Sequence, residues 1–360
     1  WDRLSLRLVV ANLRRAGIDA RLLEENPVSI QKSLRYNNGQ CIPLNIVAQE
    51  FIDFVKNRHL EPSRTVLWLA ESSIACNIKL YPHHIKSLLD TYGRGFQNAG
   101  VYVGGTSMAD ISLKLPINNY FAYMFGGGLR KLGCRIRPYE KTAGATDAVI
   151  EKSLDILADA FVGHRTKSAA LAETISLFKG IETCDTPRSA QRPKVAIFGD
   201  LYARDNPNIN QDLIRFIELH GGEVLTTPYS SYVKMIAGPY LRKWFVEGHY
   251  LHALSSKALL TEMGRREKPY ARLFNQILNE PEARFDDSPE KILAAFNVRI
   301  ENTGESMDNL LKIHYLLKHH PDISLFVQTS PAFCCPALIT EAMARDIDNK
   351  TGIPMVSITY

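Results

Sequence analysis

Short apolar runs rich in β-branched residues alternate along this chain with segments whose apolar residues recur at helical spacing. Such runs are typical of buried strands, and strands that alternate with helices form parallel sheets through βαβ connections. We predict six strands, at residues 65–69, 101–103, 194–198, 223–227, 324–327 and 355–359. We predict seven helices, at residues 44–56, 83–92, 117–132, 146–160, 210–220, 307–317 and 336–349. The pattern therefore indicates an α/β fold.

The polar, proline-containing segment 183–193 (TCDTPRSAQRP) is the best candidate for a linker between domains. A chain of 360 residues, 45% of them hydrophobic, is long enough for two cores. We therefore expect two Rossmann-like domains with parallel sheets. Residues 1–186 form the first, and residues 187–360 form the second, which carries a helical insertion between about residues 232 and 278.

Composition excludes several classes of partner. The net charge of +5 is small for this length and the basic residues are scattered, so we expect no nucleic-acid binding. No stretch approaches the roughly 20 apolar residues that cross a bilayer, and no signal peptide is visible, so we expect a cytoplasmic protein without membrane association. The chain begins with Trp1 and ends in a predicted strand, which suggests a piece of a longer polypeptide.

Four of the six cysteines lie shortly before a predicted helix. Cys41 follows a flexible turn and precedes Pro43, while Cys76 lies between the strand 65–69 and the helix 83–92. The adjacent pair Cys334 and Cys335 follows the strand 324–327. Loops at the carboxyl ends of parallel strands gather in one crevice, and helix N-termini stabilise thiolates. We therefore expect these four thiols to converge.

Thiolates are the ligands of iron–sulfur clusters, so converging cysteines predict such a site. The competing interpretation is that each cysteine packs as a small buried apolar residue, since the chain has no CxxC motif. Adjacent cysteines before a helix are harder to explain by packing. Cys134 and Cys184 lack the helix-start context, and we interpret them as a core and a linker cysteine.

Polar residues near the predicted crevice have two interpretations each. Thr329 and Ser330 either hydrogen-bond cluster sulfurs or form a turn. The glycines at 126–128 lie in a predicted helix and lack the GxGxxG spacing, so helix packing is favoured over phosphate binding. Four further residues follow the strand 194–198 and either contact substrate or form a turn: Asp200, Tyr202, Arg204 and Asp205.

Seven motifs resemble those of one superfamily: NNGQCIPLN (37–45), SSIACNIKLYP (72–82), YFAYMFGGGLRKLGCRIRPYE (120–140), RPKVAIFGDLYARDN (192–206), NQDLIRFIELHGGEV (210–224), NTGESMDNLLKIHYLLKH (302–319) and QTSPAFCCPALITEAMARDI (328–347). Across nearly its whole length the chain is similar to the 2-hydroxyacyl-CoA dehydratase D-component and double-cubane cluster protein superfamily. The likeness is to the C-terminal region of the long forms that are fused to an ATPase activator domain.

The resemblance implies two Rossmann-like domains that clasp an oxygen-sensitive cluster, either [4Fe-4S] or a double-cubane [8Fe-9S] cluster. Cys41, Cys76 and one of Cys334 and Cys335 match the family's cysteine motifs. A double cubane would require about six thiolates and so recruit Cys134 and Cys184, and we therefore favour the single cubane. The resemblance also implies an ATP-hydrolysing iron–sulfur activator as electron donor, fused or separate, and a homodimer. No phosphate-loop motif is present in this chain.

The leading hypothesis is an iron–sulfur redox protein that accepts low-potential electrons from the activator and reduces a bound small molecule at the cluster. One alternative is a 2-hydroxyacyl-CoA dehydratase subunit, which would dehydrate an acyl-CoA substrate through a ketyl radical. The other is a non-catalytic interaction domain of a fused activator. In the redox hypotheses the ligands are Cys41, Cys76 and Cys334, with Cys335 as fourth ligand or neighbour.

Overall fold

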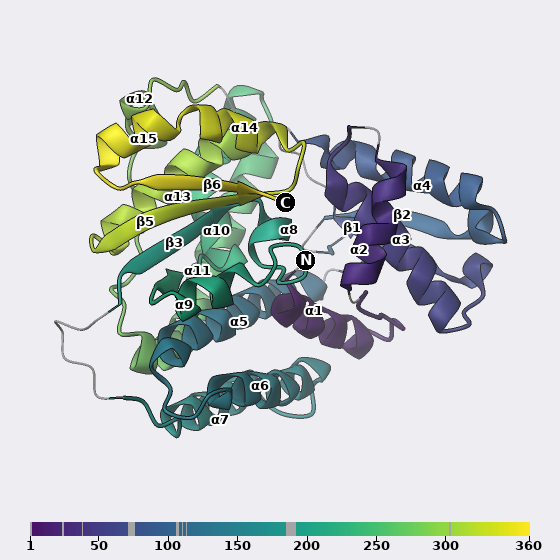
Figure 1. Cartoon of the computed structure of the whole chain (residues 1–360), viewed down its shortest axis with the longest axis horizontal. Coiled ribbons are helices and arrows are strands. Elements are labelled where there is room, and N and C mark those ends of the chain that lie inside the picture. The colour runs from purple at the N-terminus through teal and green to yellow at the C-terminus, as the bar shows by residue number, and fades with distance from the viewer. Residues whose placement is uncertain are drawn as a thin grey trace.

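The computed structural model describes residues 2–23, 25–37, 39–70, 76–105, 108–109, 111–112, 114–184, 192–301 and 304–360. The chain is α/β, as predicted, and contains two parallel sheets. Figure 1 shows a larger sheet with its helices, a smaller lobe around two strands, and a layer of long helices beside both. None of the helices in the described part of the chain is long and apolar enough to cross a membrane.

The larger sheet has four parallel strands, and the central two are paired on both sides. Their order across the sheet is β4 (Glu223–Leu225), β3 (Lys194–Gly199), β5 (Ile323–Ser330) and β6 (Met355–Thr359). All four match predicted strands. Since the strands are parallel, their carboxyl ends lie along one edge of the sheet.

Both faces of this sheet are buried. Successive side chains of β3 point to opposite sides of the sheet and enter different hydrophobic clusters. Ala196 and Phe198 belong to the hydrophobic cluster that includes α13 (Glu305–His319). Val195 and Ile197 belong to the cluster on the other face, which includes α9 (Leu213–Leu219). The continuous apolar run of β3 is explained by this burial on both faces.

The smaller lobe pairs β1 (Val66–Ala70) with β2 (Gly100–Gly104) in parallel, and both match predicted strands. Its helices are α2 (Pro27–Ser33), α3 (Ile42–Asn57) and α4 (Tyr81–Tyr92). Apolar side chains from β1, α3 and α4 form one core, which includes Leu67, Leu69, Phe51, Ile52, Ile85 and Leu89.

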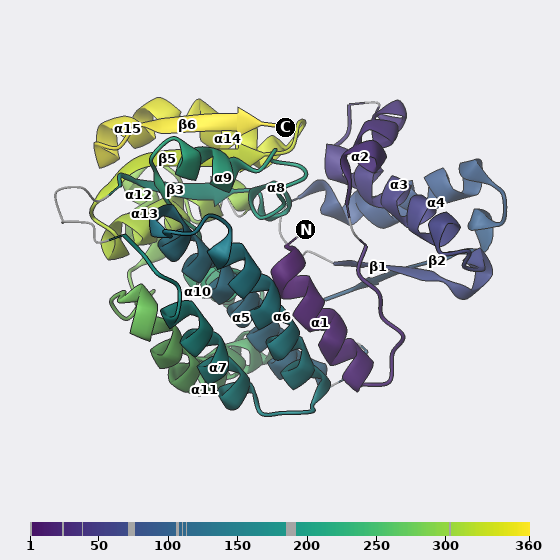
Figure 2. The same cartoon turned by 60° about the horizontal axis from the view of Figure 1, so that its bottom comes forward.

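Long helices pack together beside the two sheets, and Figure 2 shows α1, α6 and α7 side by side. These helices are α1 (Arg3–Arg15), α5 (Leu115–Ile136), α6 (Ala145–Val162), α7 (Lys167–Lys179), α10 (Tyr229–Val246) and α11 (Tyr250–Leu278). The last two occupy the region predicted as a helical insertion. Phe274 of α11 packs in the same hydrophobic cluster as Leu8 of α1 and Phe125 of α5.

The glycines at 126–128 lie inside α5 and allow three neighbours to approach closely. A Cβ atom at the first, second or third glycine would clash with Ser5 of α1, with Pro228, or with Phe274 of α11. Each of these glycines therefore meets a different partner at a distance that only glycine permits. The predicted helix-packing role of this run is confirmed.

Two predicted helices differ from the observed ones. The predicted helix 336–349 is divided at Met343 into α14 (Cys335–Ala342) and α15 (Ala344–Thr351). The helix predicted at 210–220 begins only at Leu213, because Gln211 and Asp212 have φ angles of 51° and 58° in the left-handed region. The segment predicted as a linker lies largely outside the described residues, which omit 185–191.

Strand β3 ends in a tight turn at Gly199, whose φ is 113°. The Lys312 Nζ atom donates a hydrogen bond of 3.1 Å to the Gly199 carbonyl, and the Asp200 amide donates one of 2.9 Å to the Thr329 carbonyl. A Cβ atom at position 199 would clash with the Thr329 backbone. The turn that positions Asp200 therefore requires glycine.

We predict that Gly199→Ala lowers the free energy of unfolding by about 3 kcal/mol, because backbone strain and a backbone clash act together. Gly221→Ala is the matched control, since Gly221 also has a positive φ of 90° but no atom within 4 Å of the position that a Cβ would occupy. Its expected cost is about 1 kcal/mol. Urea unfolding followed by circular dichroism measures both, and equal losses would contradict the prediction.

Candidate cluster site

Three of the cysteines predicted as ligands immediately precede a helix. Cys41 precedes α3, Cys76 precedes the 3-10 helix η3 (Asn77–Leu80) that leads into α4, and Cys334 precedes α14. Cys335 is the first residue of α14. The predicted positions at helix starts are confirmed. We call these four residues the junction cysteines: Cys41, Cys76, Cys334 and Cys335.

Proline fixes where the three α-helices at this site begin. The second residue of α3, α4 and α14 is Pro43, Pro82 and Pro336, respectively. Proline has a φ angle suited to the first turn and lacks an N–H that would have no helical partner there. The remaining N–H groups of each first turn give a partial positive charge, which favours a nearby thiolate.

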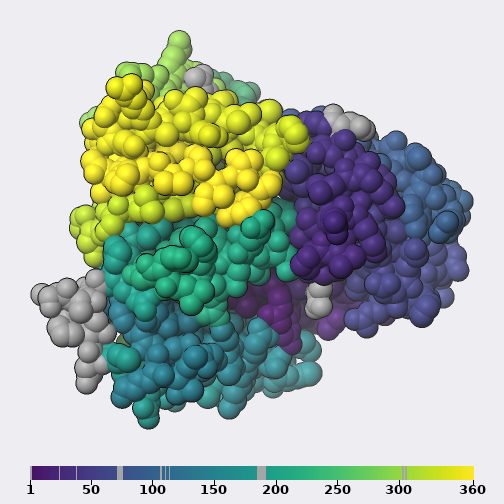
Figure 3. Space-filling view, viewed as in Figure 1, coloured from purple at the N-terminus to yellow at the C-terminus, as the bar shows by residue number. Residues whose placement is uncertain are grey.

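The segment from Asn77 to Tyr81 contacts one junction cysteine of the smaller lobe and one that follows the larger sheet. The Tyr81 hydroxyl donates a hydrogen bond of 3.1 Å to the Sγ atom of Cys41. The Asn77 Nδ2 atom lies 3.9 Å from the Sγ atom of Cys335, within hydrogen-bonding range of sulfur. Residues 41, 77 and 335 are far apart in sequence, so the fold brings them to one place. In Figure 3 the smaller lobe, coloured purple to blue, adjoins the part of the molecule coloured teal and yellow.

The pKa of the Tyr81 hydroxyl is a second indication that Tyr81 lies close to cysteine side chains. Burial raises the pKa of Tyr81 well above its ordinary value, and the negative charges of Cys41, Asp200 and Cys76 raise it further. Tyr81 therefore remains protonated and available as a hydrogen-bond donor. The same interactions indicate that Asp200, at the carboxyl end of β3, lies near Tyr81.

The loop that carries the adjacent cysteines is fixed by backbone contacts. Ala332 donates a hydrogen bond of 2.7 Å to the carbonyl of Tyr360, which follows β6. Phe333 has a φ of 65°, a conformation that side chains other than glycine rarely adopt. After this turn Cys334 is buried and Cys335 is exposed. Of the pair, only Cys335 therefore faces the solvent side of the loop.

The residues after β3 connect the two lobes. Asp200 accepts a hydrogen bond of 2.8 Å from the Ala203 amide and so begins the short helix α8 (Leu201–Arg204). Tyr202 and Asn206 both donate hydrogen bonds to the carboxylate of Glu25, in the segment before α2. Asp200 thus performs turn chemistry, one of its two predicted roles, while Tyr202 fastens the smaller lobe.

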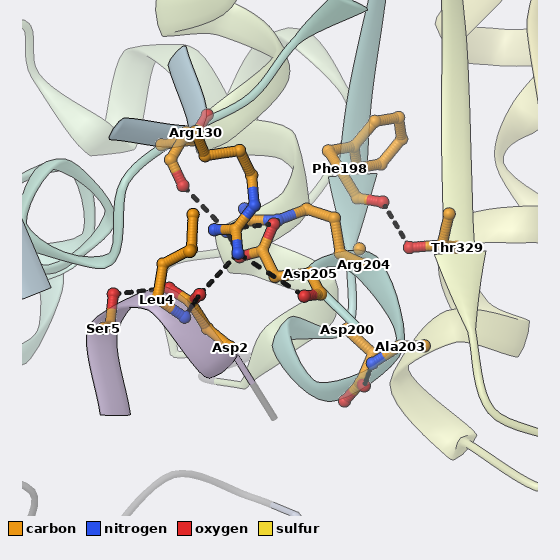
Figure 4. A network of polar contacts seen from close by, with 12 residues as sticks. Asp2, Leu4, Ser5, Arg130, Phe198, Asp200, Ala203, Arg204, Asp205 and Thr329 are labelled. Atoms are coloured by element: carbon orange, nitrogen blue, oxygen red, sulfur yellow. Dashed lines mark hydrogen bonds and ion pairs between the residues drawn. The ribbon is translucent and has the colours of Figure 1, made fainter. Parts of the chain in front are cut away.

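Arg204 and Asp205 take part in a buried ion network (Figure 4). Arg130 of α5 pairs with Asp2, at the start of α1, and its Nη1 atom lies 3.6 Å from Asp205. Arg204 also pairs with Asp205, and it donates a hydrogen bond of 2.7 Å to the carbonyl of Thr227. Paired in this way, these charges hold α1, α5 and α8 together.

Two further charged residues lie buried on α13. Lys312, which supports Gly199, has its Nζ atom 4.5 Å from the centre of the Tyr232 ring. The Tyr232 hydroxyl donates a hydrogen bond of 2.8 Å to Asp308. Burial raises the pKa of Asp308 to about 6, although the Lys312 charge and the Tyr232 hydrogen bond oppose this rise.

Cys134 and Cys184 lie in different surroundings from the junction cysteines. Cys134 is buried in the cluster beneath β3, and burial raises the pKa of its thiol to about 12. The interpretation of Cys134 as a core cysteine is confirmed. Cys184 is exposed and its amide donates to the carbonyl of Tyr139. Cys134 lies inside α5 and so lacks the helix-start context that the junction cysteines share.

Thr329 and Ser330 belong to β5 instead of forming a turn. The Thr329 hydroxyl donates to the carbonyl of Phe198 at 3.3 Å, and the Ser330 hydroxyl lies 3.4 Å from that of Thr359. The sequence interpretation did not single out Tyr81 or Asn77, which make the sulfur contacts. Their sequence signals were proximity to Cys76 and a place in the motif SSIACNIKLYP (72–82).

Among the residues that the structure describes, no three His, Cys, Asp or Glu side chains form a group that could hold a metal ion. No family model, curated protein or solved structure matches the chain.

We predict that Asp308→Asn changes how stability depends on pH. Because the folded-state pKa of Asp308 is raised, its contribution to stability is fully present below about pH 4 and is lost as the pH rises through 6. The wild type should therefore lose about 1 kcal/mol relative to the variant between pH 5 and pH 7.5. Urea unfolding of both proteins at each pH measures this, and a constant difference would contradict it.

Proposed function

We propose that the chain is an iron–sulfur redox protein whose cluster is held by the junction cysteines. The observation that carries this proposal is the pair of contacts from one short segment. Tyr81 bonds the Cys41 sulfur at 3.1 Å, and Asn77 lies 3.9 Å from the Cys335 sulfur. Thiols that belong to different lobes thereby contact the two ends of one five-residue segment, which supports a shared cluster.

The chemistry of the donor set fits a cluster better than a single ion. A single ion requires its ligands around one point, whereas the Cys41 and Cys335 sulfurs contact opposite ends of the segment from Asn77 to Tyr81. In a cubane each thiolate binds a different iron, so the sulfurs lie farther apart. Cys41, Cys76 and Cys334 also precede helix starts, whose partial positive charge stabilises an anionic cluster.

We favour a single [4Fe-4S] cubane over a double cubane. A double cubane would require about six thiolates. Cys134 is a poor fifth ligand because it is buried in a hydrophobic cluster with Val195 and Ile197. Cys41, Cys76 and Cys334 are proposed as ligands, and Cys335, which is exposed, as the fourth ligand or a neighbour.

A bound cluster of this kind supplies single electrons of low potential. The chain itself would hold it between the two lobes, with Glu25 and Tyr202 fastening one lobe to the other. We propose that the electrons come from an ATP-hydrolysing activator and reduce a small molecule. This follows the superfamily resemblance, as does the inference that both α/β parts are Rossmann-like. The parallel larger sheet, covered on both faces, supports that inference.

Iron analysis of anaerobically purified protein tests the proposal. We expect about four irons and as many acid-labile sulfides per chain. Cys41→Ser and Cys76→Ser should lose both, since each removes a proposed ligand. Cys184→Ser is the matched control and should retain them, because this exposed cysteine is not a proposed ligand. An iron-free wild type would contradict the cluster proposal and favour an interaction domain. Iron loss in the control alone would contradict the assigned ligands.

A further inference from the structure

We propose that Tyr81 is a positioning residue of the cluster site and sets the reduction potential of the cluster through its hydrogen bond to Cys41. This inference rests on the proposed function. It begins from the distance of 3.1 Å between the Tyr81 hydroxyl oxygen and the Cys41 sulfur. The hydroxyl is the donor in this contact, and the sulfur is the atom through which Cys41 would bind iron.

The Tyr81 ring is held in place by its packing. Tyr81 is the first residue of α4 and packs against the core of the smaller lobe. That core also contains Leu44 and Ala48 of α3, the helix that Cys41 precedes. The donor and the acceptor are therefore attached to two helices that share one hydrophobic core, which keeps their separation constant.

The Cys41 loop is held from its other side as well. The Gln40 side chain donates hydrogen bonds of 2.7 Å to the Tyr36 carbonyl and 3.0 Å to the Asn45 side chain. These contacts join the turn before Cys41 to the first turn of α3. The sulfur of Cys41 is thus oriented by its own loop and meets the Tyr81 hydroxyl without rearrangement.

A hydrogen bond to a ligand sulfur affects the two oxidation states of a cluster unequally. Reduction adds one electron, which comes from the external reductant, and increases the negative charge shared by the sulfurs. A donor therefore stabilises the reduced state more than the oxidised state and raises the reduction potential. Removing the hydroxyl of Tyr81 should make the cluster harder to reduce.

The test compares Tyr81→Phe with Tyr92→Phe. Tyr92 is the last residue of α4 and packs in the same core, but its hydroxyl contacts Lys56 at 3.3 Å instead of a cysteine. Iron and sulfide are measured first. The midpoint potential is then measured by anaerobic titration with dithionite in the presence of mediator dyes, followed by the EPR signal of the reduced cluster.

We expect both variants to retain iron and sulfide. In Tyr81→Phe the reduction equilibrium should fall about tenfold, which is a potential about 59 mV more negative for a one-electron couple. Tyr92→Phe should match the wild type. A loaded Tyr81→Phe protein with the wild-type potential would overturn this inference and leave the proposed function intact. An iron-free wild type would overturn both.

A measurement on the wild type keeps the inference testable if Tyr81→Phe does not fold. A hydroxyl proton bonded to a ligand sulfur should give an exchangeable proton coupling in the ENDOR spectrum of the reduced cluster, and this coupling should disappear in D₂O. Its absence from the wild type would overturn the inference. Loss of iron from a folded Tyr81→Phe protein, with iron retained in Tyr92→Phe, would also overturn it, since Tyr81 would then serve assembly and not potential.

Discussion

Arg130 lies inside α5 and forms ion pairs with Asp2 and Asp205, which lie at the start of α1 and after β3. Burying these charges is tolerated only because, together with Arg204, two cations and two anions compensate one another and make further hydrogen bonds. Asp2 bonds Ser5, and Asp205 bonds Arg204. The layer of long helices and the carboxyl edge of the larger sheet therefore depend on one another at this point. The turn after β3 is held by the ion pairs of Asp205 and also by Lys312, which donates a hydrogen bond to the Gly199 carbonyl.

Residues that follow β3, at the carboxyl edge of the larger sheet, also contact the smaller lobe. Tyr202 and Asn206 donate to the Glu25 carboxylate, and Ile46 of α3 packs with Ala203 of α8. The hydrogen bonds to Glu25 and a small hydrophobic cluster thus join the lobes near the junction cysteines. The junction cysteines therefore come from three separate helix starts without a local CxxC motif, and how the lobes meet sets where their sulfurs lie. Figure 1 places both ends of the chain near the same junction.

The strands and the starts of α3, α4 and α14 were predictable because they depend on local patterns. The apolar runs at β3 and β5 are continuous because both faces of the larger sheet are buried, and prolines at positions 43, 82 and 336 identify where helices begin. Errors arose where backbone conformation overrides pattern. The left-handed φ angles of Gln211 and Asp212 delay α9, although the sequence pattern predicted a start at residue 210.

The sequence alone determined the α/β class, the strands and the position of each candidate thiol at a helix start, since all of these follow from short-range periodicity and from proline. Only the tertiary structure decided which groups meet. Tyr81 and Asn77 contact sulfurs that are 40 and 258 residues away in sequence. Arg130 pairs with a residue 128 positions earlier. Such contacts are set by packing between helices, including the close approach that the glycines at 126–128 allow, and no local pattern encodes which partner will be met.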